Sequence, residues 1–415
     1  MTETEPAVPS TAAGEDLLDP NEPARLVTRE FVLVTLAGLF ALIGFSSTLP
    51  LVPRYVEDEL AGGKVAVGVA VGIFSVSALL ARPFVGRLGD ERGRRFIIVG
   101  GTALTALSVA AHALATTLPL LYAVRLAMGF TQGAFFVGTA TLVNDIAPPN
   151  RRGEATSYFS VAIYAGMAFG PVLGEIVQRS AGFGWAFAAG GASLVVATLF
   201  GLLLAPHRPE HAETATLDDA AGGHGGRRAR RRILHPAAIG PGLVLFCGIV
   251  TFTAMNGFMP LLVEEWDLGT AGPVFLTYGL LVLVFRLVGS RIPDRLGTAR
   301  TALIALVGQV AGMLIIGARP SLVGLYTGAA VLAIGGSLLY PALLTAAIDG
   351  VPASERATAT STFSMAFELS AGIGGPVLGY VAGLGGNRAA FYAAAAFAAA
   401  GIPLLFVWNR RLAAG

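Results

Sequence analysis

The fold is decided by the stretch GRLGDERGRRFII at residues 86–98, which joins an apolar segment at 65–85 to another at 96–117. Its spacing of arginine, aspartate and glycine returns 204 positions later, where Arg82 matches Arg286, Arg87 matches Arg291, Asp90 matches Asp294 and Gly93 matches Gly297. Later matches include Tyr122 with Tyr326, Asp145 with Asp349, Arg152 with Arg356 and Ser157 with Ser361. This internal symmetry predicts two similar halves.

The composition places most of the chain in a lipid bilayer. Of its 415 residues 54% are hydrophobic and 13% are charged, and the mean hydropathy is +0.69. Soluble domains carry about 25% charged residues, so this chain has too little charge to cover a surface that faces water. A soluble enzyme is excluded, and the net charge of +2 gives no support to nucleic-acid binding. The single cysteine, Cys247, can form no disulfide within the chain.

Apolar segments of about 20 residues, the length that crosses a bilayer, occur twelve times. They lie at 31–52, 65–85, 96–117, 119–144, 155–178, 183–205, 237–262, 271–290, 300–318, 320–347, 357–383 and 388–409. We therefore expect an all-α integral membrane protein with two six-helix bundles, at 31–205 and 237–409, related by a pseudo-two-fold repeat. The remaining segments are a disordered tail at 1–30, a linker at 206–236 and a short tail at 410–415. Six spans per half give both halves the same orientation.

The basic residues predict which side of the membrane each segment faces. With the N-terminus inside, twenty Lys and Arg residues fall on the inner side and five on the outer side. Positive segments stay in the cytoplasm, so both termini are expected there, in a multi-pass protein of the inner or plasma membrane. The arginine cluster at 227–232 ends a polar linker, where it suits anionic lipid headgroups. The bilayer and a small-molecule substrate are the expected partners, and the chain is expected to act as a monomer.

The stretch at 86–98 resembles the hallmark loop of the major facilitator superfamily, roughly G-x-L-a-D-r-x-G-r-k, although Gly89 and Glu91 depart from that pattern. The resemblance extends over about residues 30–410. It implies that this loop latches the outward-facing state, whereas a generic positive turn would explain the arginines alone. The expected latch residues are Gly86, Asp90, Gly93, Arg94 and Arg95, together with Asp145, Arg152, Asp294 and Gly297.

A second motif, GMAFGPVLGE at 166–175, resembles the glycine and proline motif of drug/proton antiporters. Glu175 replaces its last glycine, and Ser157 stands where an earlier glycine is expected. Small residues four apart allow helices to cross closely, and proline weakens the local helix. The predicted packing hinge comprises Gly166, Gly170, Pro171 and Gly174, with Gly375, Pro376 and Gly379 in the second half. By resemblance this motif indicates export, although its recurrence at 370–379 is also consistent with plain architecture.

Three charged residues inside spans are candidates for proton coupling: Arg125, Glu368 and Glu175. The string RLAMGFTQG at 125–133 is similar to the superfamily pattern that ties this arginine to coupling. Burial disfavours a charged carboxylate, so an acidic residue inside a span can bind and release protons. The structural alternatives are that Arg125 snorkels to the headgroups, that Glu368 pairs with an arginine or serine, and that Glu175 reaches the outer interface.

The expected function is proton-coupled efflux by alternating access. Few charges line the spans, which favours a lipophilic or weakly cationic substrate. Protons are the coupling ion, no other cofactor is expected, and no histidine spacing matches a compact metal site. The expected cavity residues are Ser47, Gln132, Asn256, Tyr340, Phe363 and Phe367. A proton symporter or uniporter for a metabolite or sugar is the alternative, followed by a non-transporting receptor. No ATP-binding glycine loop or catalytic set supports an enzyme.

Overall fold

The computed structural model describes residues 26–148, 151–206, 234–289, 295–352 and 355–414, and this part of the chain is helical with no strand. The first half contains α1 (Arg29–Ser46), α2 (Thr48–Arg54), α3 (Lys64–Arg92), α4 (Arg94–Ala111), α5 (Leu118–Ile146), α6 (Arg152–Ala181) and α7 (Phe183–Leu202). A π-helical turn, Tyr55–Glu59, follows α2, and a 3-10 turn, His112–Leu114, follows α4. The second half contains α9 (Pro236–Glu265), α10 (Gly272–Gly289), α12 (Thr298–Ala318), α13 (Leu322–Ile348), α14 (Arg356–Gly385) and α15 (Asn387–Ala414).

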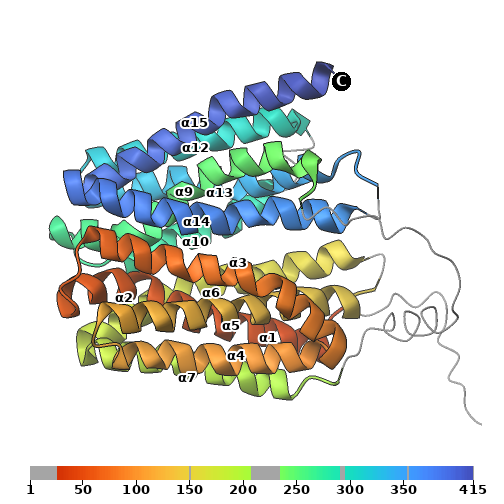
Figure 1. Cartoon of the computed structure of the whole chain (residues 1–415), viewed down its shortest axis with the longest axis horizontal. Helices are drawn as coiled ribbons and strands as arrows, with labels where there is room; N and C mark the ends of the chain where they lie inside the picture. The colour runs from red at the N-terminus through yellow and green to blue at the C-terminus, as the bar shows by residue number, and fades with distance from the viewer. Residues whose placement is uncertain (1–25, 149–150, 207–233, 290–294, 353–354, 415) are drawn as a thin grey trace, which may run out of the picture.

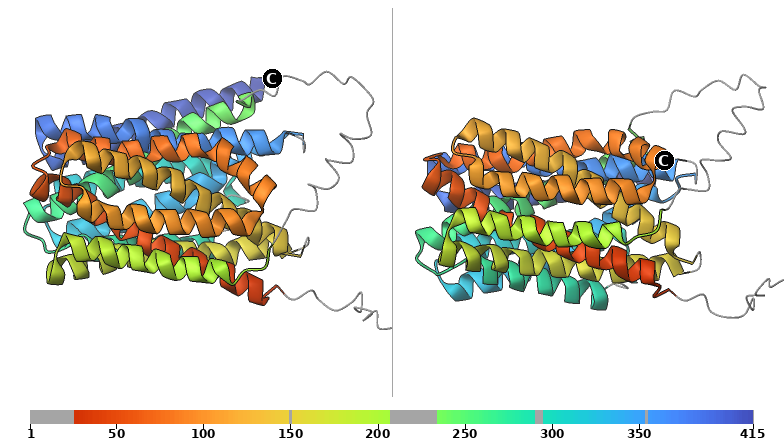
Figure 2. Two further views of the ribbon diagram at one scale, coloured as in Figure 1. Left: turned by 60° about the horizontal axis from the view of Figure 1, so that its bottom comes forward. Right: turned by 90° about the horizontal axis from the view of Figure 1, so that it is seen from below.

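The helices run along one common direction, with the second half stacked on the first (Figure 1), and the two views in Figure 2 show the same arrangement. We call the end at which α1 begins and α15 finishes the terminal end, and the other end the far end. Eleven described helices or helical stretches are long and apolar enough to cross a membrane, and a twelfth apolar helix, Gly272–Val288, is shorter. The predicted all-α membrane fold is confirmed.

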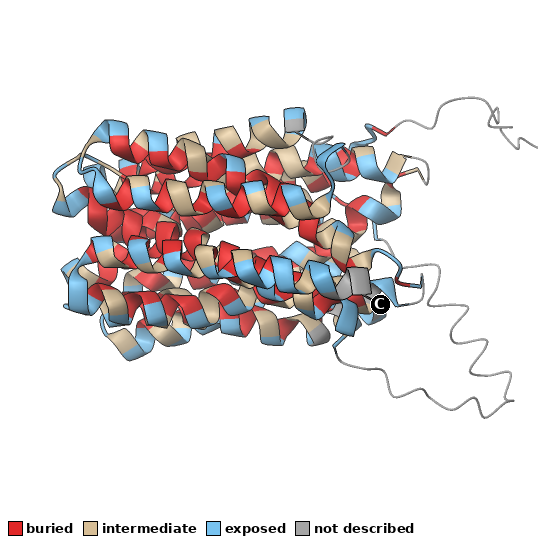
Figure 3. Ribbon diagram, turned by 90° about the horizontal axis from the view of Figure 1, so that it is seen from above, coloured by how far each residue is buried: buried red, intermediate tan, exposed pale blue. Residues whose placement is uncertain are grey.

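Burial follows the pattern of a bundle surrounded by lipid. Buried residues gather between the helices, and exposed residues mark their outer faces (Figure 3). Large apolar side chains remain exposed there, among them Leu107 at 68%, Leu114 at 74% and Val288 at 78%. Such surfaces are rare on soluble proteins and suit acyl chains. The bundle therefore presents apolar side chains outward along its length.

The hydrophobic core differs between the two ends. At the far end one cluster joins the halves, containing Leu51 and Val67 of the first half and Phe258, Phe275 and Leu378 of the second. At the terminal end the halves have separate clusters, one around Phe31 and Leu142 and another around Leu306 and Phe363. The halves are thus fastened to each other by apolar packing at the far end.

The structure corrects two expected boundaries. The stretch at 86–98 is no loop, because α3 continues to Arg92 and α4 begins at Arg94. Gly93 makes the whole turn with φ of 88°, a conformation that favours glycine, and its N–H donates to the Gly89 carbonyl. The residues expected as a tail at 410–414 belong to α15. Most of the expected N-terminal tail and linker, residues 1–25 and 207–233, lies outside the described residues.

Candidate functional site

A glycine seam closes the far end where α3 crosses α14. Gly68 and Gly72 of α3 face Gly375 and Gly379 of α14. A Cβ atom added to Gly375 would lie only 2.5 Å from the Gly68 carbonyl oxygen, and one added to Gly379 would lie 2.6 Å from the Lys64 carbonyl oxygen. Small residues here let the two backbones touch, which is how membrane helices approach most closely.

Polar contacts reinforce this end between α2 and α6 of the first half and α9 and α10 of the second. The Glu175 carboxylate accepts the backbone N–H groups of Ala271 at 3.0 Å and Gly272 at 2.6 Å, so a carboxylate of one half caps the first turn of α10 in the other. A negative group at a helix N-terminus is favourable. Arg54 pairs with Glu264 at 3.0 Å, and Arg179 donates to the Gly269 carbonyl at 2.9 Å.

A cross-half ion pair lies further along the same seam, toward the terminal end. Arg82 of α3 meets Glu368 of α14 at 2.8 Å, with side-chain exposures of 30% and 13%. Ser75 of α3 lies beside the same carboxylate. Glu368 thus links the two halves near the middle of both helices.

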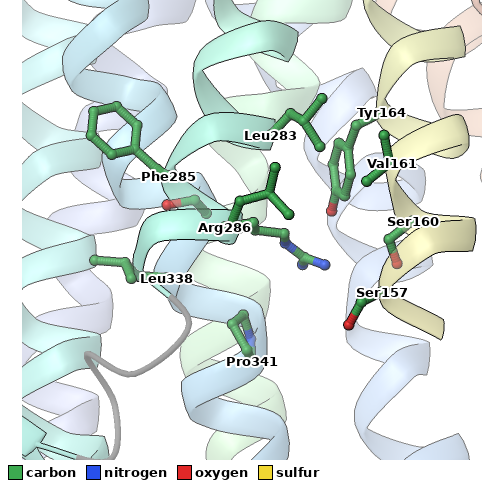
Figure 4. Close-up of a pocket in the computed structure, with 11 residues that line it drawn as sticks. Ser157, Ser160, Val161, Tyr164, Leu283, Phe285, Arg286, Leu338 and Pro341 are labelled. Atoms are coloured by element: carbon green, nitrogen blue, oxygen red, sulfur yellow. The ribbon is translucent and has the colours of Figure 1, made fainter. Parts of the chain in front are cut away.

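A cavity of about 270 Å³ lies between α6, α10 and α13, toward the terminal end (Figure 4). Its polar lining comes from Ser157, Ser160 and Tyr164 of α6, Arg286 of α10 and Ser337 of α13, and its apolar lining includes Val161, Leu283 and Leu338. The Arg286 guanidinium extends from α10 toward α6 and lies 4.9 Å from the centroid of the Tyr164 ring. The buried Nε of Arg286 has no hydrogen-bond partner among the described residues.

The residues expected to line a cavity lie elsewhere. Ser47 is fully buried, donates to the Gly44 carbonyl and packs against α6 and α7. Phe363 is fully buried beside Tyr340, Phe367 packs on Phe252, and Asn256 is buried in α9 with its side-chain oxygen unpartnered among the described residues. Gln132 is half-buried in α5. None of these lines the cavity in Figure 4, whose lining comes from α6, α10 and α13, and the expected set stays a prediction.

Arg125 stays within the first half. Its Nε donates to the Ala70 carbonyl at 2.9 Å, and its guanidinium lies 5.0 Å from the centroid of the Phe74 ring. The structure therefore joins Arg125 to one face of α3, while Glu368 meets α3 at Arg82. The three expected coupling residues thus occupy separate sites. Glu175 and Glu368 each contact the other half, whereas the contacts of Arg125 among the described residues stay within the first half.

Among the expected latch residues, Arg94, Asp145 and Arg95 hold helices of the first half together. Arg94 pairs with Asp145 at 3.2 Å, and Arg95 donates to the Leu202 carbonyl at 2.6 Å. Gly297 has φ of 78° and directly precedes α12 as Gly93 precedes α4, and Arg152 is the first residue of α6. Gly86 and Asp90 belong to α3, but the surroundings of Gly86, the side chain of Asp90 and the whole of Asp294 lie outside what the structure describes.

The two glycine and proline strings of the expected hinge pack on different partners. Gly166, Gly170 and Gly174 face α1, Ser47 and the start of α2 in their own half. Gly375 and Gly379 face α3 of the other half, and Pro376 lies beside Gly72 in the same seam. The glycines of the first string thus pack within their own half and those of the second across the halves, while Val172 of the first string lies near Gly272 of α10.

Sequence reasoning missed the roles of Arg82, Arg286 and Tyr164. The repeat contains the signal that finds them, because the shift of 204 positions that matches Arg82 with Arg286 also matches Tyr164 with Glu368. The ion pair between α3 and α14 and the arginine–tyrosine contact between α10 and α6 are therefore the same position in the two halves.

Comparison with known proteins identifies the family. The family model described as Major Facilitator Superfamily matches residues 34–265 and 241–414. An uncharacterised MFS-type transporter of Pseudomonas aeruginosa (strain UCBPP-PA14) is 30% identical over 411 residues, covering 94% of this chain and 97% of that protein.

Solved structures agree on the fold. The nucleoside transporter NupG superposes with a TM-score of 0.73 at 16% identity, over 92% of this chain and 99% of that one. The human organic anion transporter MFSD10 (TETRAN) superposes with a TM-score of 0.66 at 21% identity, over 91% and 99%. With the repeated halves, the apolar helices and the family match over nearly the whole chain, the protein belongs to the major facilitator superfamily of membrane transporters.

Proposed function

We propose that this chain is a proton-coupled secondary transporter that exports a small molecule by alternating access, with its terminal end in the cytoplasm. The Arg82–Glu368 ion pair is the observation that carries the proposal, because it joins the two halves through a group that protonation neutralises. The far end is sealed by glycine contacts and by Glu175, and the cavity lies toward the terminal end. This geometry supports a state that is closed to the outside.

The pair gives a physical route from proton binding to a change of state. A charged Glu368 holds α14 to α3 through Arg82, and a neutral Glu368 loses the charged attraction while Arg82 keeps its own charge. In the state described here the pair is formed, which fits a transporter that has released its proton to the cytoplasm. A difference of one pH unit supplies about 1.4 kcal/mol per proton, enough for about tenfold accumulation in a one-to-one exchange.

The substrate class is argued from the cavity, because members of this fold differ in cargo. The solved neighbours are titled as transporters of nucleosides and of organic anions, and a fold does not fix its substrate. The sequence favours a lipophilic or weakly cationic compound, since few charges line the spans. The cavity instead presents the Arg286 guanidinium, which disfavours a cation. We retain export and proton coupling and revise the cargo below.

A thiol reporter at the far end tests proton coupling without a known substrate. The reporter position is Val67 of α3, which is fully buried. Val71, one turn further along α3, lies near Gly257 of α9 in the other half. In a Cys247→Ser background, Val67→Cys is labelled with a membrane-impermeant maleimide from the outside at pH 5.5 and pH 7.5. Rates are normalised to a thiol at the exposed Ser180.

We expect acid to speed labelling about five- to thirtyfold, the population change for about 1–2 kcal/mol. In the Glu368→Gln variant, labelling of Val67→Cys should be fast at both pH values. In Arg319→Gln, at an exposed position outside the seam, labelling should respond to pH as in the parent. Labelling of the parent that does not change with pH, or a pH response that survives in Glu368→Gln, would exclude this coupling route.

A further inference from the structure

The two halves carry the same arginine but different partners for it. Arg82 meets a carboxylate, Glu368, whereas Arg286, its repeat counterpart, meets the ring of Tyr164. The position that provides the negative charge in the first contact is thus occupied by a phenol in the second. The guanidinium of Arg286 is consequently left without an anionic partner among the described residues.

A guanidinium without an anionic partner inside a membrane span is unfavourable in free energy. Charged groups at membrane depth normally pair with one another or face a wet cavity. A cation over an aromatic face gains about 0.5–2 kcal/mol, but the Tyr164 ring, 4.9 Å from the guanidinium carbon, provides no anionic group. The buried Nε remains unpartnered among the described residues, and buried unpaired donors are uncommon in native structures. Both facts indicate a missing acceptor.

The cavity around Arg286 has the chemistry of an anion site. Arg286 is the one charged residue among the lining residues that the structure describes. The hydroxyls of Ser157, Ser160 and Ser337 donate to backbone carbonyls of their own helices. This leaves the guanidinium and the Tyr164 hydroxyl as the donors that face the cavity in Figure 4. Leu283, Val161 and Leu338 add an apolar wall.

We propose that this cavity binds the anionic group of an amphipathic organic molecule, with Arg286 as its anchor and the apolar wall against its hydrocarbon part. Guanidinium matches carboxylate, phosphate and sulfonate groups through paired N–H donors. A volume of about 270 Å³ suits a compact ring acid. The bound anion then fills the place that Glu368 occupies beside Arg82 in the other half.

Binding of an anion at Arg286 specifies the cargo of the proposed transporter, and the direction of its transport rests on the proposed function. Exchange of an outgoing anion for an incoming proton moves two charges in the same electrical sense per cycle. A membrane potential that is negative inside therefore drives both movements, whereas one-to-one symport of the same anion with a proton would move no net charge. Export is the direction in which an anion gains most from the potential.

Binding is measured on the full-length protein in a neutral detergent, without any gradient. The probes are 2-naphthoate, 2-naphthamide and 2-naphthylmethylamine, which share a ring system and differ in charge. Thermal stabilisation against probe concentration gives an apparent affinity for each. We expect the acid to bind at least about tenfold more tightly than the amide, since hydrogen bonds to a charged group contribute more than neutral ones, and the amine to give no stabilisation.

Two variants test whether Arg286 is the anchor. Arg286→Gln should remove the preference for the acid, while Arg319→Gln, an exposed arginine far from the cavity lining, should keep it. Tyr164→Glu restores the carboxylate that the repeat places beside the arginine, so it should abolish acid binding with Arg286 still present. Melting temperatures without probe show whether each variant is folded.

Three results would overturn the proposal: equal binding of all three probes, an acid preference that persists in Arg286→Gln, or no stabilisation by the acid. Phosphatidylglycerol added to the same detergent sample distinguishes a lipid headgroup from a free solute. Stabilisation by that lipid that depends on Arg286 and displaces the acid would assign the site to lipid and also overturn the proposal. Loss of proton coupling in the thiol assay would leave these binding results unchanged, so the two failures are separable.

Discussion

Glu175 shows how one side chain seals an end of the molecule. It is 3% exposed and accepts two backbone N–H groups from the start of α10, 96 and 97 positions further along the chain. The sequence places it at the outer interface, but the partner is a backbone turn in the other half and leaves no pattern in the side chains. A carboxylate in this place fastens the first turn of α10 through backbone hydrogen bonds.

Replacing Glu175 by Gln keeps its size and removes its charge, so one amide oxygen must replace two carboxylate oxygens. We expect labelling of Val67→Cys from the outside to rise about tenfold, the effect of losing a hydrogen bond to a charged group. Glu264→Gln is the matched control, because Glu264 is 49% exposed in its pair with Arg54 and exposed pairs contribute about 0.2–1 kcal/mol. Equal rates in the two variants would show that Glu175 does not hold the far end closed.

At the scale of elements, the string GPVLG occurs in both α6 and α14 but serves two contacts. In α6 its glycines pack against α1 and Ser47 inside one bundle, and in α14 they form the seam with α3 across the bundles. The repeat predicts close packing at both places. It does not predict the partner, because which helix a glycine face meets depends on how the two halves are docked.

This difference predicts different consequences for the same substitution. Gly174→Ala places a methyl against the backbone of Ser47 in its own half, so we expect a loss of stability of about 1–3 kcal/mol, read as a lower melting temperature in detergent. Gly375→Ala places a methyl 2.5 Å from the Gly68 carbonyl oxygen in the other half. The halves can separate to relieve that contact, so faster labelling of Val67→Cys is expected, with a smaller change in melting temperature.

Gly242→Ala serves as the control for both, because its added methyl would meet Ala366 at 3.7 Å, an ordinary contact. Its melting temperature and labelling rate should stay near those of the parent. The reverse outcome, with Gly375→Ala mainly lowering the melting temperature and Gly174→Ala mainly opening the seam, would contradict the assignment of the two strings.

For the whole molecule, the sequence was sufficient for the helices and the two-half plan but not for the site. Length and hydropathy locate the spans, and the 204-position match predicts the halves, because both follow directly from the order of residues along the chain. The Arg82–Glu368 pair and the cavity around Arg286 form between halves, from residues more than 100 positions apart. Hydropathy gives no information about which faces meet there.

The orientation of the whole molecule is a testable expectation of the arginine distribution. Green fluorescent protein fused after Gly415 should fluoresce, because it folds in the cytoplasm. Alkaline phosphatase at the same point should be inactive, because its disulfides form only in an oxidising compartment outside the cytoplasm. Alkaline phosphatase inserted in the turn between α4 and α5, after Ala115, should be active. Active phosphatase at the C-terminus would reverse the orientation.

The glycine seam between α3 and α14 has a consequence for how tightly the membrane stays insulated. Where one backbone rests on another, with Gly375 against Gly68 and Gly379 against Lys64, no space is left for a file of water molecules. Protons hop along such files, and a continuous leak would dissipate the gradient on which the proposed exchange depends. A seam made of glycine therefore also limits proton leak across the membrane, because backbone meets backbone at these positions.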